Sequence, residues 1–195
     1  MSTFADLLKC DPIDMDTVAA HLDALPHDER VKQVRRVGGG LQRKLFAAAQ
    51  GFKALDHAYY VPEATDDKTF VRHYGKNSLP LFSIFEKRFA RPEPESPVMW
   101  GYNHSSMMPL VGPGHFVLRT GPGDGEMHVD YYSTPPERLD GAPKLKANDS
   151  GISTLVYGHM IDVMRGVSDH VSIGRAVKKG ARTANYFLLC REGAA

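Results

Sequence analysis

Three side chains that can bind or transfer protons occupy alternate positions in the segment GEMHVDYY. They are Glu126, His128 and Asp130. Alternate residues of a β-strand point to the same side of the sheet, so in a strand all three would share one face. An imidazole exchanges a proton near neutral pH, and a neighbouring carboxylate can orient it. The spacing therefore makes His128 a candidate general acid or base, with Asp130 or Glu126 as its partner.

The same three side chains have the chemistry of metal ligands, because imidazole and carboxylate groups bind zinc and iron. By strand rise they extend over about 13 Å, which is too far for them to surround one ion unaided. Further ligands would have to come from other histidines, and we predict no metal site. If the opposite, apolar face of this strand forms the core, the polar face is simply exposed to water.

The segment MWGYNH alternates in the same way and places Trp100, Tyr102 and His104 on one face. Tryptophan and tyrosine offer large apolar rings with one polar atom each. In a hollow barrel these rings would line a pocket and orient a ligand. In a filled interior they would contribute packing alone, and both alternatives stay open.

The expected pocket draws its wall and its polar anchors from several segments. The wall residues are Trp100, Tyr102, Phe116, Tyr157 and Tyr186, and the polar anchors are His104, His128 and Arg165. Asp162 lies close to Arg165 in the sequence, near a turn. Buried together, these two side chains could hold a ligand carboxylate, whereas an exposed pair would be structural.

A sheet must position these residues, because from Val98 onward the chain consists of short β-rich segments separated by turns. The segments are VMWGYNH, HFVLRT, GEMHVDYY, ISTLVYGHM, IDVMRGV, DHVSIGRAV and RTANYFLLCR. Asp124-Gly125 marks a hairpin tip, and KKGAR joins the last two strands. A long connection over 133–150 interrupts the series. The pattern predicts an antiparallel meander that closes into a barrel, since closure removes exposed edges.

The first half of the chain has helical periodicity instead. Apolar residues recur three or four positions apart after Asp14 or Asp16, again after Pro26, and again after the glycines at 38–40. A further helix is predicted over 78–89, SLPLFSIFEKRF, with Ser78 as its cap and its phenylalanines on one face. We therefore predict one α+β domain, 1–195, in which a mainly helical subregion, 1–92, packs on a lipocalin-like barrel, 93–195.

Composition limits the classes of function. The chain has 24 Lys and Arg against 23 Asp and Glu, a balance that argues against a general nucleic-acid binder. The glycines at 38–40 lack a preceding strand and a following Gly-Lys-Ser/Thr, so they do not form a phosphate-binding loop. No apolar run approaches the roughly 18 residues of a membrane span. The partner expected on these grounds is a small molecule.

Cysteine usage and the first residues indicate the compartment. Cys10 and Cys190 lie near opposite ends and do not have the spacing of a metal site. The segment MSTFADLLKCDPIDMD is acidic and lacks the basic and apolar regions of a signal peptide. We expect a cytoplasmic protein with reduced thiols, and whether the two cysteines pair stays open.

The stretch LVYGHMIDVMRGVSDHVSIGRAVKKGARTANYFLLCR resembles the end of the GXWXG-type lipocalin-like bacterial proteins. The matching positions are Tyr157, Ile161, Asp162, Arg165, Val167, Asp169, Gly174, Tyr186 and Phe187. The resemblance covers about a fifth of the chain. It implies a small calycin-type barrel, a fold that commonly holds an apolar ligand, and it implies no catalytic residues.

The leading prediction is a barrel that binds a small hydrophobic molecule, such as a lipid, a tetrapyrrole or a polyketide-like metabolite. No cofactor is identified from the residues. One alternative is an enzyme on the same scaffold that uses His128 with Asp130 or Glu126. A second alternative is an interaction or scaffold module that presents the FSIFEKRF face or the valine stripe of the helices to a partner. The sequence leaves room for an oligomer.

Overall fold

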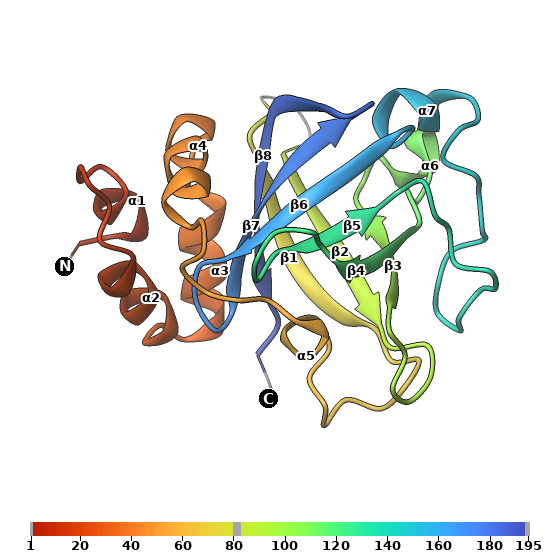
Figure 1. Ribbon diagram of the computed structural model, residues 1–195, viewed down its shortest axis with the longest axis horizontal. Coiled ribbons are helices and arrows are strands. Elements are labelled where there is room, and N and C mark those ends of the chain that lie inside the picture. Colours follow the sequence, from red (N-terminus) through yellow and green to blue (C-terminus); the bar gives the residue numbers. More distant parts are fainter. Residues whose placement is uncertain (1, 80–82, 194–195) are drawn as a thin grey trace.

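The computed structural model describes residues 2–79 and 83–193. In this part of the chain, eight antiparallel strands form a closed barrel, and the N-terminal helices stand together at one side of it (Figure 1). The strands are β1 (Val71–Asn77), β2 (Ile84–Ala90), β3 (Met99–His104), β4 (Phe116–Thr120), β5 (Met127–Asp130), β6 (Met160–Gly166), β7 (Val171–Lys178) and β8 (Ala181–Arg191). The predicted α+β fold, with N-terminal helices and a closing antiparallel meander, is confirmed.

The barrel closes because its first and last strands pair. β1 is hydrogen-bonded to β2 on one side and to β8 on the other, with Val71 opposite Phe89 and His73 opposite Arg191. Each described strand therefore has two neighbours, which leaves none of them as a sheet edge. The predicted hairpin turn joins β4 to β5, and Gly125 adopts a φ of 65° in it.

The described helices are α1 (Phe4–Leu7), α2 (Met15–Asp23), α3 (His27–Arg35), α4 (Gly39–Ala48), α5 (His57–Tyr60), α6 (Met108–Val111) and α7 (Ile152–Val156). Three of them, α2 to α4, match helical segments that the sequence predicts, whereas α1, α5, α6 and α7 were not predicted as helices. The Asp14 carboxylate accepts a hydrogen bond from the backbone N–H of Thr17 at 3.1 Å and so caps α2. Gly38 is the N-cap of α4 and lies at the predicted break after α3, whereas Gly39 and Gly40 are the first residues of α4.

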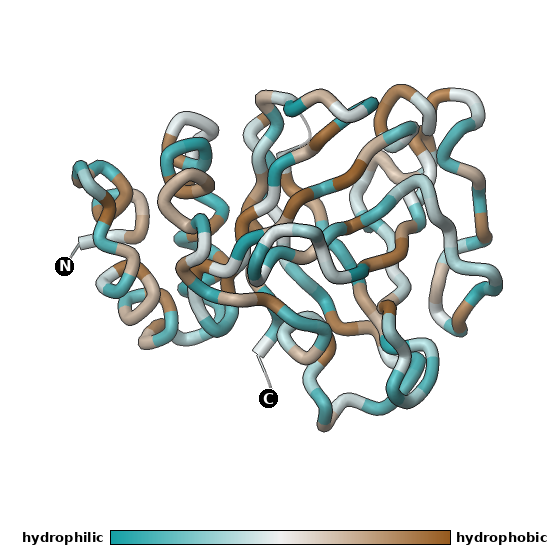
Figure 2. The backbone as a smooth tube through the Cα atoms, viewed as in Figure 1, coloured by the Kyte–Doolittle hydropathy of each residue, from teal (hydrophilic) through white to brown (hydrophobic). Residues whose placement is uncertain are grey.

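Helices α3 and α4 pack on the outside of the barrel at β1, β7 and β8, and α1 packs on α2 and α3 (Figure 1). Val34 and Leu45 from these helices bury completely against Ile173 and Leu188 of the strands. Each such side chain contributes about 1.5–3 kcal/mol by leaving water. Figure 2 shows the hydrophobic stretches in both the helices and the strands next to them. In the described part of the chain, no helix has the length and apolar character needed to cross a bilayer.

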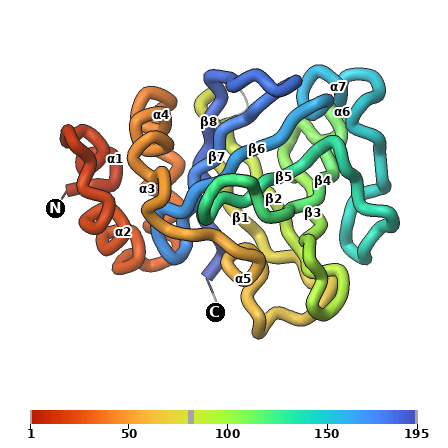
Figure 3. Tube along the Cα trace, viewed as in Figure 1, coloured from red at the N-terminus to blue at the C-terminus, as the bar shows by residue number. Residues whose placement is uncertain are grey.

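Two predicted elements are wrong. The helix predicted over 78–89 is strand β2 in its second half, whereas 80–82 lie outside the described residues. The segment ISTLVYGHM, predicted as a strand, begins with helix α7 and reaches β6 only at Met160. Strand β1 was not predicted either, and the barrel starts at Val71 and not near 93. Figure 3 labels β1 and β2 after α5 along the trace.

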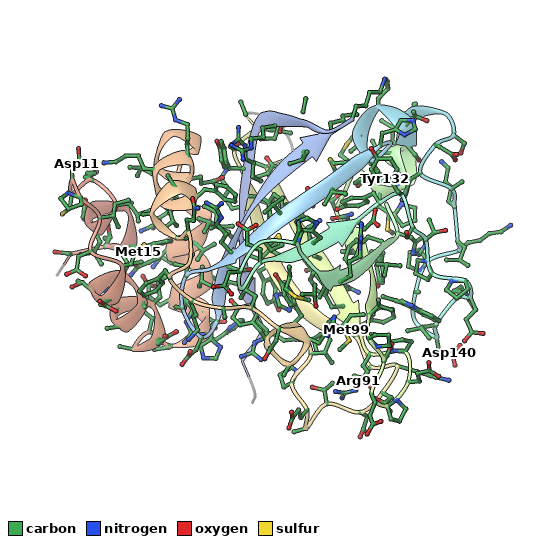
Figure 4. All side chains as sticks on the ribbon, viewed as in Figure 1. Asp11, Met15, Arg91, Met99, Tyr132 and Asp140 are labelled. Carbon is green, nitrogen blue, oxygen red and sulfur yellow. The ribbon has the colours of Figure 1, made fainter. Side chains whose placement is uncertain are left out.

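The two ends of the barrel differ. Tyr60 of α5 fills one end, where its ring centroid lies 4.8 Å from that of Phe89 and 5.4 Å from that of His73. The strand ends that lead into α6 and α7 form the other end. Figure 4 shows side chains throughout the barrel, with Met99 within it and Tyr132 near α7. The filled end and the second end therefore offer different environments.

Candidate ligand-binding cavity

The barrel interior is not filled along its whole length. A cavity of about 360 Å³ lies at the end bordered by α6 and α7. Its wall is mainly apolar and aromatic, with a small group of polar side chains. The lining residues are Asn77, Leu79, Phe85, Lys87, Asn103, Ser105, Met107, Val111, Tyr131, Val156, Tyr157, Met160, Asp162, Ala176, Asn185, Tyr186 and Phe187.

The most deeply buried polar group of this cavity is the ammonium of Lys87. Its Nζ lies 3.0 Å from Oδ2 of Asp162, and the two side chains are 2% and 3% exposed. The Nζ also donates to Oδ1 of Asn103 at 2.9 Å and to the hydroxyl of Tyr131. Three acceptors thus surround a group with three N–H donors. A buried charge needs this complete set of partners, because an unpaired one is strongly destabilising.

The remaining contacts make this polar cluster rigid. Asn103 donates from Nδ2 to the carbonyl of Gly114 at 3.0 Å and to the Tyr131 hydroxyl at 3.1 Å. The Tyr131 hydroxyl lies 3.3 Å from Oδ2 of Asp162. The ring of Tyr157 stacks on that of Tyr131 with centroids 5.4 Å apart. We refer to Lys87, Asp162, Tyr131 and Asn103 as the polar cluster.

Burial dominates the electrostatics of the polar cluster. It lowers the pKa of Lys87, and the Asp162 carboxylate opposes that change. Burial raises the pKa of Tyr131 well above its ordinary value, and the charge of Asp162 raises it further. The pKa of Tyr157 is raised to about 12 by burial and by Asp162. Near neutral pH both phenols are therefore uncharged. Lys87 and Asp162 form an ion pair with no net charge.

Sequence reasoning missed this cluster, although a signal for it was present. Along β2, Lys87 alternates with Phe85 and Phe89, and along β6, Asp162 alternates with Met160 and Met164. Each charged residue therefore interrupts an otherwise apolar face of a strand. A charge in that position must find a partner inside the barrel.

The expected wall residues of β3 point away from the cavity. Asn103 joins the polar cluster, so Met99, Gly101 and Asn103 face inward and Trp100, Tyr102 and His104 face outward. A Cβ at Gly101 would lie 2.3 Å from the Phe116 ring, so this inward position has room only for glycine. Trp100 and Tyr102 border a shallow depression under the long connection, next to its residues Pro135 and Leu139.

The other expected wall residues have different places. The ring of Tyr157 lines the cavity and stacks on Tyr131. Tyr186 borders the cavity, but its ring packs outside the barrel, 5.6 Å from that of Phe46 in α4. Phe116 is fully buried inside the barrel, and its ring centroid lies 5.1 Å from Nζ of Lys87. Of these three rings, two therefore contact the polar cluster.

The expected acid–base residues lie on the outer face of β5, because Val129 and Tyr131 occupy the inner face. Asp130 forms an ion pair with Arg119 at 3.0 Å and accepts from the backbone N–H of Tyr132 at 2.9 Å. Burial and the charge of Arg119 lower the pKa of His128. The structure thus keeps Glu126, His128 and Asp130 on one strand face but places them outside the cavity.

Arg165 also has a structural partner in place of the expected Asp162. Its Nε lies 2.6 Å from Oε1 of Glu126, and it donates from Nη1 to the carbonyl of Phe46 at 2.7 Å. The guanidinium also lies 4.1 Å from the centroid of the Phe46 ring. Arg165 therefore fastens α4 to the barrel, whereas Asp162 pairs with Lys87 inside it.

Parts of the two faces expected to meet a protein partner are buried in the fold, whereas Ile84 of the FSIFEKRF segment is exposed and Phe82 lies outside the described residues. Phe89 of the FSIFEKRF segment lies inside the barrel, and Val31, Val34 and Val37 lie in the core between the helices and the sheet. In the described residues, no three His, Cys, Asp or Glu side chains gather as a metal site would require. A larger depression of about 460 Å³ lies outside the barrel, between α3 and Tyr74 of β1.

The site is thus a partly filled eight-stranded barrel with a buried ion pair in an aromatic cavity. No family model, curated relative or solved structure matches this chain. The functional argument therefore depends on the cavity and its residues.

Proposed function

We propose that this protein binds a small apolar molecule inside the barrel. The observation that carries the proposal is the cavity of about 360 Å³, whose wall includes Phe85, Val111, Tyr157 and Phe187. Pockets for small molecules in proteins are typically about 300–1,000 Å³, mainly apolar, with a few polar groups that orient the ligand. The polar cluster supplies those groups. Lipids, tetrapyrroles and polyketide-like metabolites are the candidate classes.

The mouth of the cavity supports an apolar ligand. Leu79 and Val156 line the cavity and are 43% and 39% exposed. Leu110 of α6 and Leu155 of α7, the two helices at this end, are 55% and 77% exposed. Exposed apolar side chains gathered around an opening are typical of a binding site. They give an apolar molecule favourable contacts before it enters.

A filled-cavity variant tests the proposal. The neutral fluorophore N-phenyl-1-naphthylamine is titrated into the wild type and into Ala176→Phe, which places a ring in the cavity. Val177→Phe is the matched control, because Ala176 lines the cavity and its neighbour on β7 has the opposite side-chain direction. We expect Ala176→Phe to weaken probe binding at least about tenfold and Val177→Phe to leave it nearly unchanged.

Mass spectrometry of organic extracts from the purified protein identifies any molecule that copurifies. The proposal fails if the wild type binds no apolar probe and its extracts contain no small molecule in stoichiometric amount. Equal loss of binding in the two phenylalanine variants would show that the probe binds elsewhere.

A further inference from the structure

We propose that the ligand of this cavity is a neutral molecule whose polar end is a hydroxyl, and that the cavity selects against carboxylates of the same length. The inference rests on the proposed function and specifies the class of ligand. It follows from two features of the polar cluster, its balanced charge and its hydrogen bonds.

The charge balance disfavours an anionic ligand. Lys87 and Asp162 form a pair at 3.0 Å with side chains 2% and 3% exposed, so their charges already cancel in a dry environment. A ligand carboxylate would add a second negative charge next to Asp162. Burying a charge without a partner costs several kcal/mol. The lysine offers no spare partner, because Asp162, Asn103 and Tyr131 take its three donors.

The hydrogen bonds favour a donor on the ligand. Oδ2 of Asp162 receives Lys87 and lies 3.3 Å from the Tyr131 hydroxyl, whereas in the described residues no hydrogen bond reaches Oδ1. A carboxylate oxygen accepts hydrogen bonds, so Oδ1 has acceptor capacity that a ligand can use. Asp162 lines the cavity, so a ligand hydroxyl can donate to Oδ1.

Tyr157 can supply the hydrogen-bond donor for the oxygen of a ligand hydroxyl. It lines the cavity, and in the described residues its own hydroxyl makes no hydrogen bond. Its raised pKa, about 12, keeps the proton on the phenol near neutral pH. A ligand hydroxyl can therefore donate to Asp162 and accept from Tyr157. A carboxylate can do only the second.

Three ligands of equal chain length test the selectivity of the wild type. 1-Decanol, decyl methyl ether and decanoate compete against bound N-phenyl-1-naphthylamine at about pH 8, where a fatty acid is ionised. We expect decanol to bind at least about tenfold more tightly than decanoate, with the ether between them. If the probe binds and decanoate displaces it at the same concentration as decanol does, the inference is overturned and the proposed function stands. If neither the probe nor decanol binds, both are overturned.

Asp162→Asn tests the origin of the selectivity. It removes the negative charge next to the ligand, and a bound carboxylate can then replace Asp162 as the counter-ion of Lys87, so decanoate should now bind more tightly than decanol. Asp130→Asn is the matched control, since Asp130 is also buried but pairs with Arg119 outside the cavity, and the preference for decanol should persist. An unchanged preference in a folded Asp162→Asn variant contradicts the charge argument. If that variant does not fold, the wild-type ratio still decides.

Discussion

Lys87 and Asp162 face each other across the inside of the barrel, with Nζ 3.0 Å from Oδ2. They come from β2 and β6, which are not hydrogen-bonded neighbours in the sheet. The pair therefore joins two opposite walls through the interior, in addition to the backbone ladder that joins each strand to the next. It presents a polar surface to the cavity, and its contribution to stability can be measured separately.

The first prediction concerns the stability contributed by this pair. Lys87→Met leaves Asp162 buried without its cation, and we expect a loss of about 3–5 kcal/mol in the free energy of unfolding. The double variant Lys87→Met/Asp162→Leu removes both charges, so it should be more stable than Lys87→Met alone. Urea denaturation of the wild type, both single variants and the double variant gives the coupling energy. Additive losses would contradict a direct pairing.

The second prediction concerns the close approach at Gly101. A Cβ there would lie 2.3 Å from the Phe116 ring and 2.4 Å from the carbonyl oxygen of Arg88. We expect Gly101→Ala to destabilise the fold by about 1–3 kcal/mol, the usual cost of overpacking. Gly40→Ala is the control, since a Cβ there meets nothing within 4 Å. In helix α4 this change should stabilise by about 0.4–1 kcal/mol. Thermal denaturation compares the two, and equal effects would refute the steric argument.

The third prediction concerns the attachment of α4 to the barrel. Arg165→Met removes the ion pair with Glu126 and the hydrogen bond to the Phe46 carbonyl. We expect a loss of about 1–3 kcal/mol and faster amide exchange in α4 than in the barrel strands. Arg182→Met, at an exposed position on β8, should change stability by less than about 0.5 kcal/mol. Equal protection of α4 in both variants would argue against a fastening role.

The fourth prediction concerns acid stability. Burial lowers the pKa of His73 to about 3, and its Nε2 lies 3.0 Å from the carbonyl oxygen of Tyr60. Below a pH of about 6.5, His73 binds a proton in the unfolded chain but stays neutral in the folded protein. The contribution of His73 is therefore complete above that pH and is lost as the pH falls toward 3. In this range the free energy of unfolding falls by up to about 1.4 kcal/mol for each pH unit.

Urea denaturation between about pH 6 and pH 4 measures this slope. His73→Leu should reduce it by close to one proton, although the variant also loses the contact with Tyr60. Burial lowers the pKa of His57 and His128 too, so part of the slope should persist. An identical slope in His73→Leu and the wild type would show that His73 is protonated in the folded state.

The sequence predicts most of the architecture, because the strands after Val98 alternate and are separated by turn residues. The prediction fails where the apolar residues of one segment fit both the helical and the strand periodicity. In 78–89 the phenylalanines fit a helical face, but Phe85 and Phe89 also share a strand face with Lys87. Pairing with β1 and β3 selects the strand. Helix α7 was also predicted as a strand. Its Ser153 donates to the carbonyl of Val111 in α6, and this contact between distant parts of the sequence cannot be read from the local pattern.

The candidate site is harder to predict, because alternation shows that two faces exist but does not show which one is inside. Asn103 and Tyr102 are adjacent, yet one joins the polar cluster and the other packs against Phe70 outside the barrel. Tertiary contacts decide the direction, including the space that Gly101 leaves for Phe116. The partnership of Lys87 with Asp162 could not be predicted either, since it depends on the closed barrel.

The pairing of β1 with β8 has a consequence for synthesis. It joins distant parts of the chain, and next to it the backbone N–H of Arg72 donates to a carboxylate oxygen of Glu192 at 2.7 Å. A ribosome releases β1 long before β8, so a nascent chain holds an incomplete sheet whose outermost strands can pair with other chains. Such long-range pairing is intrinsically slow. Chaperones that shield the growing sheet should therefore raise the yield of folded protein.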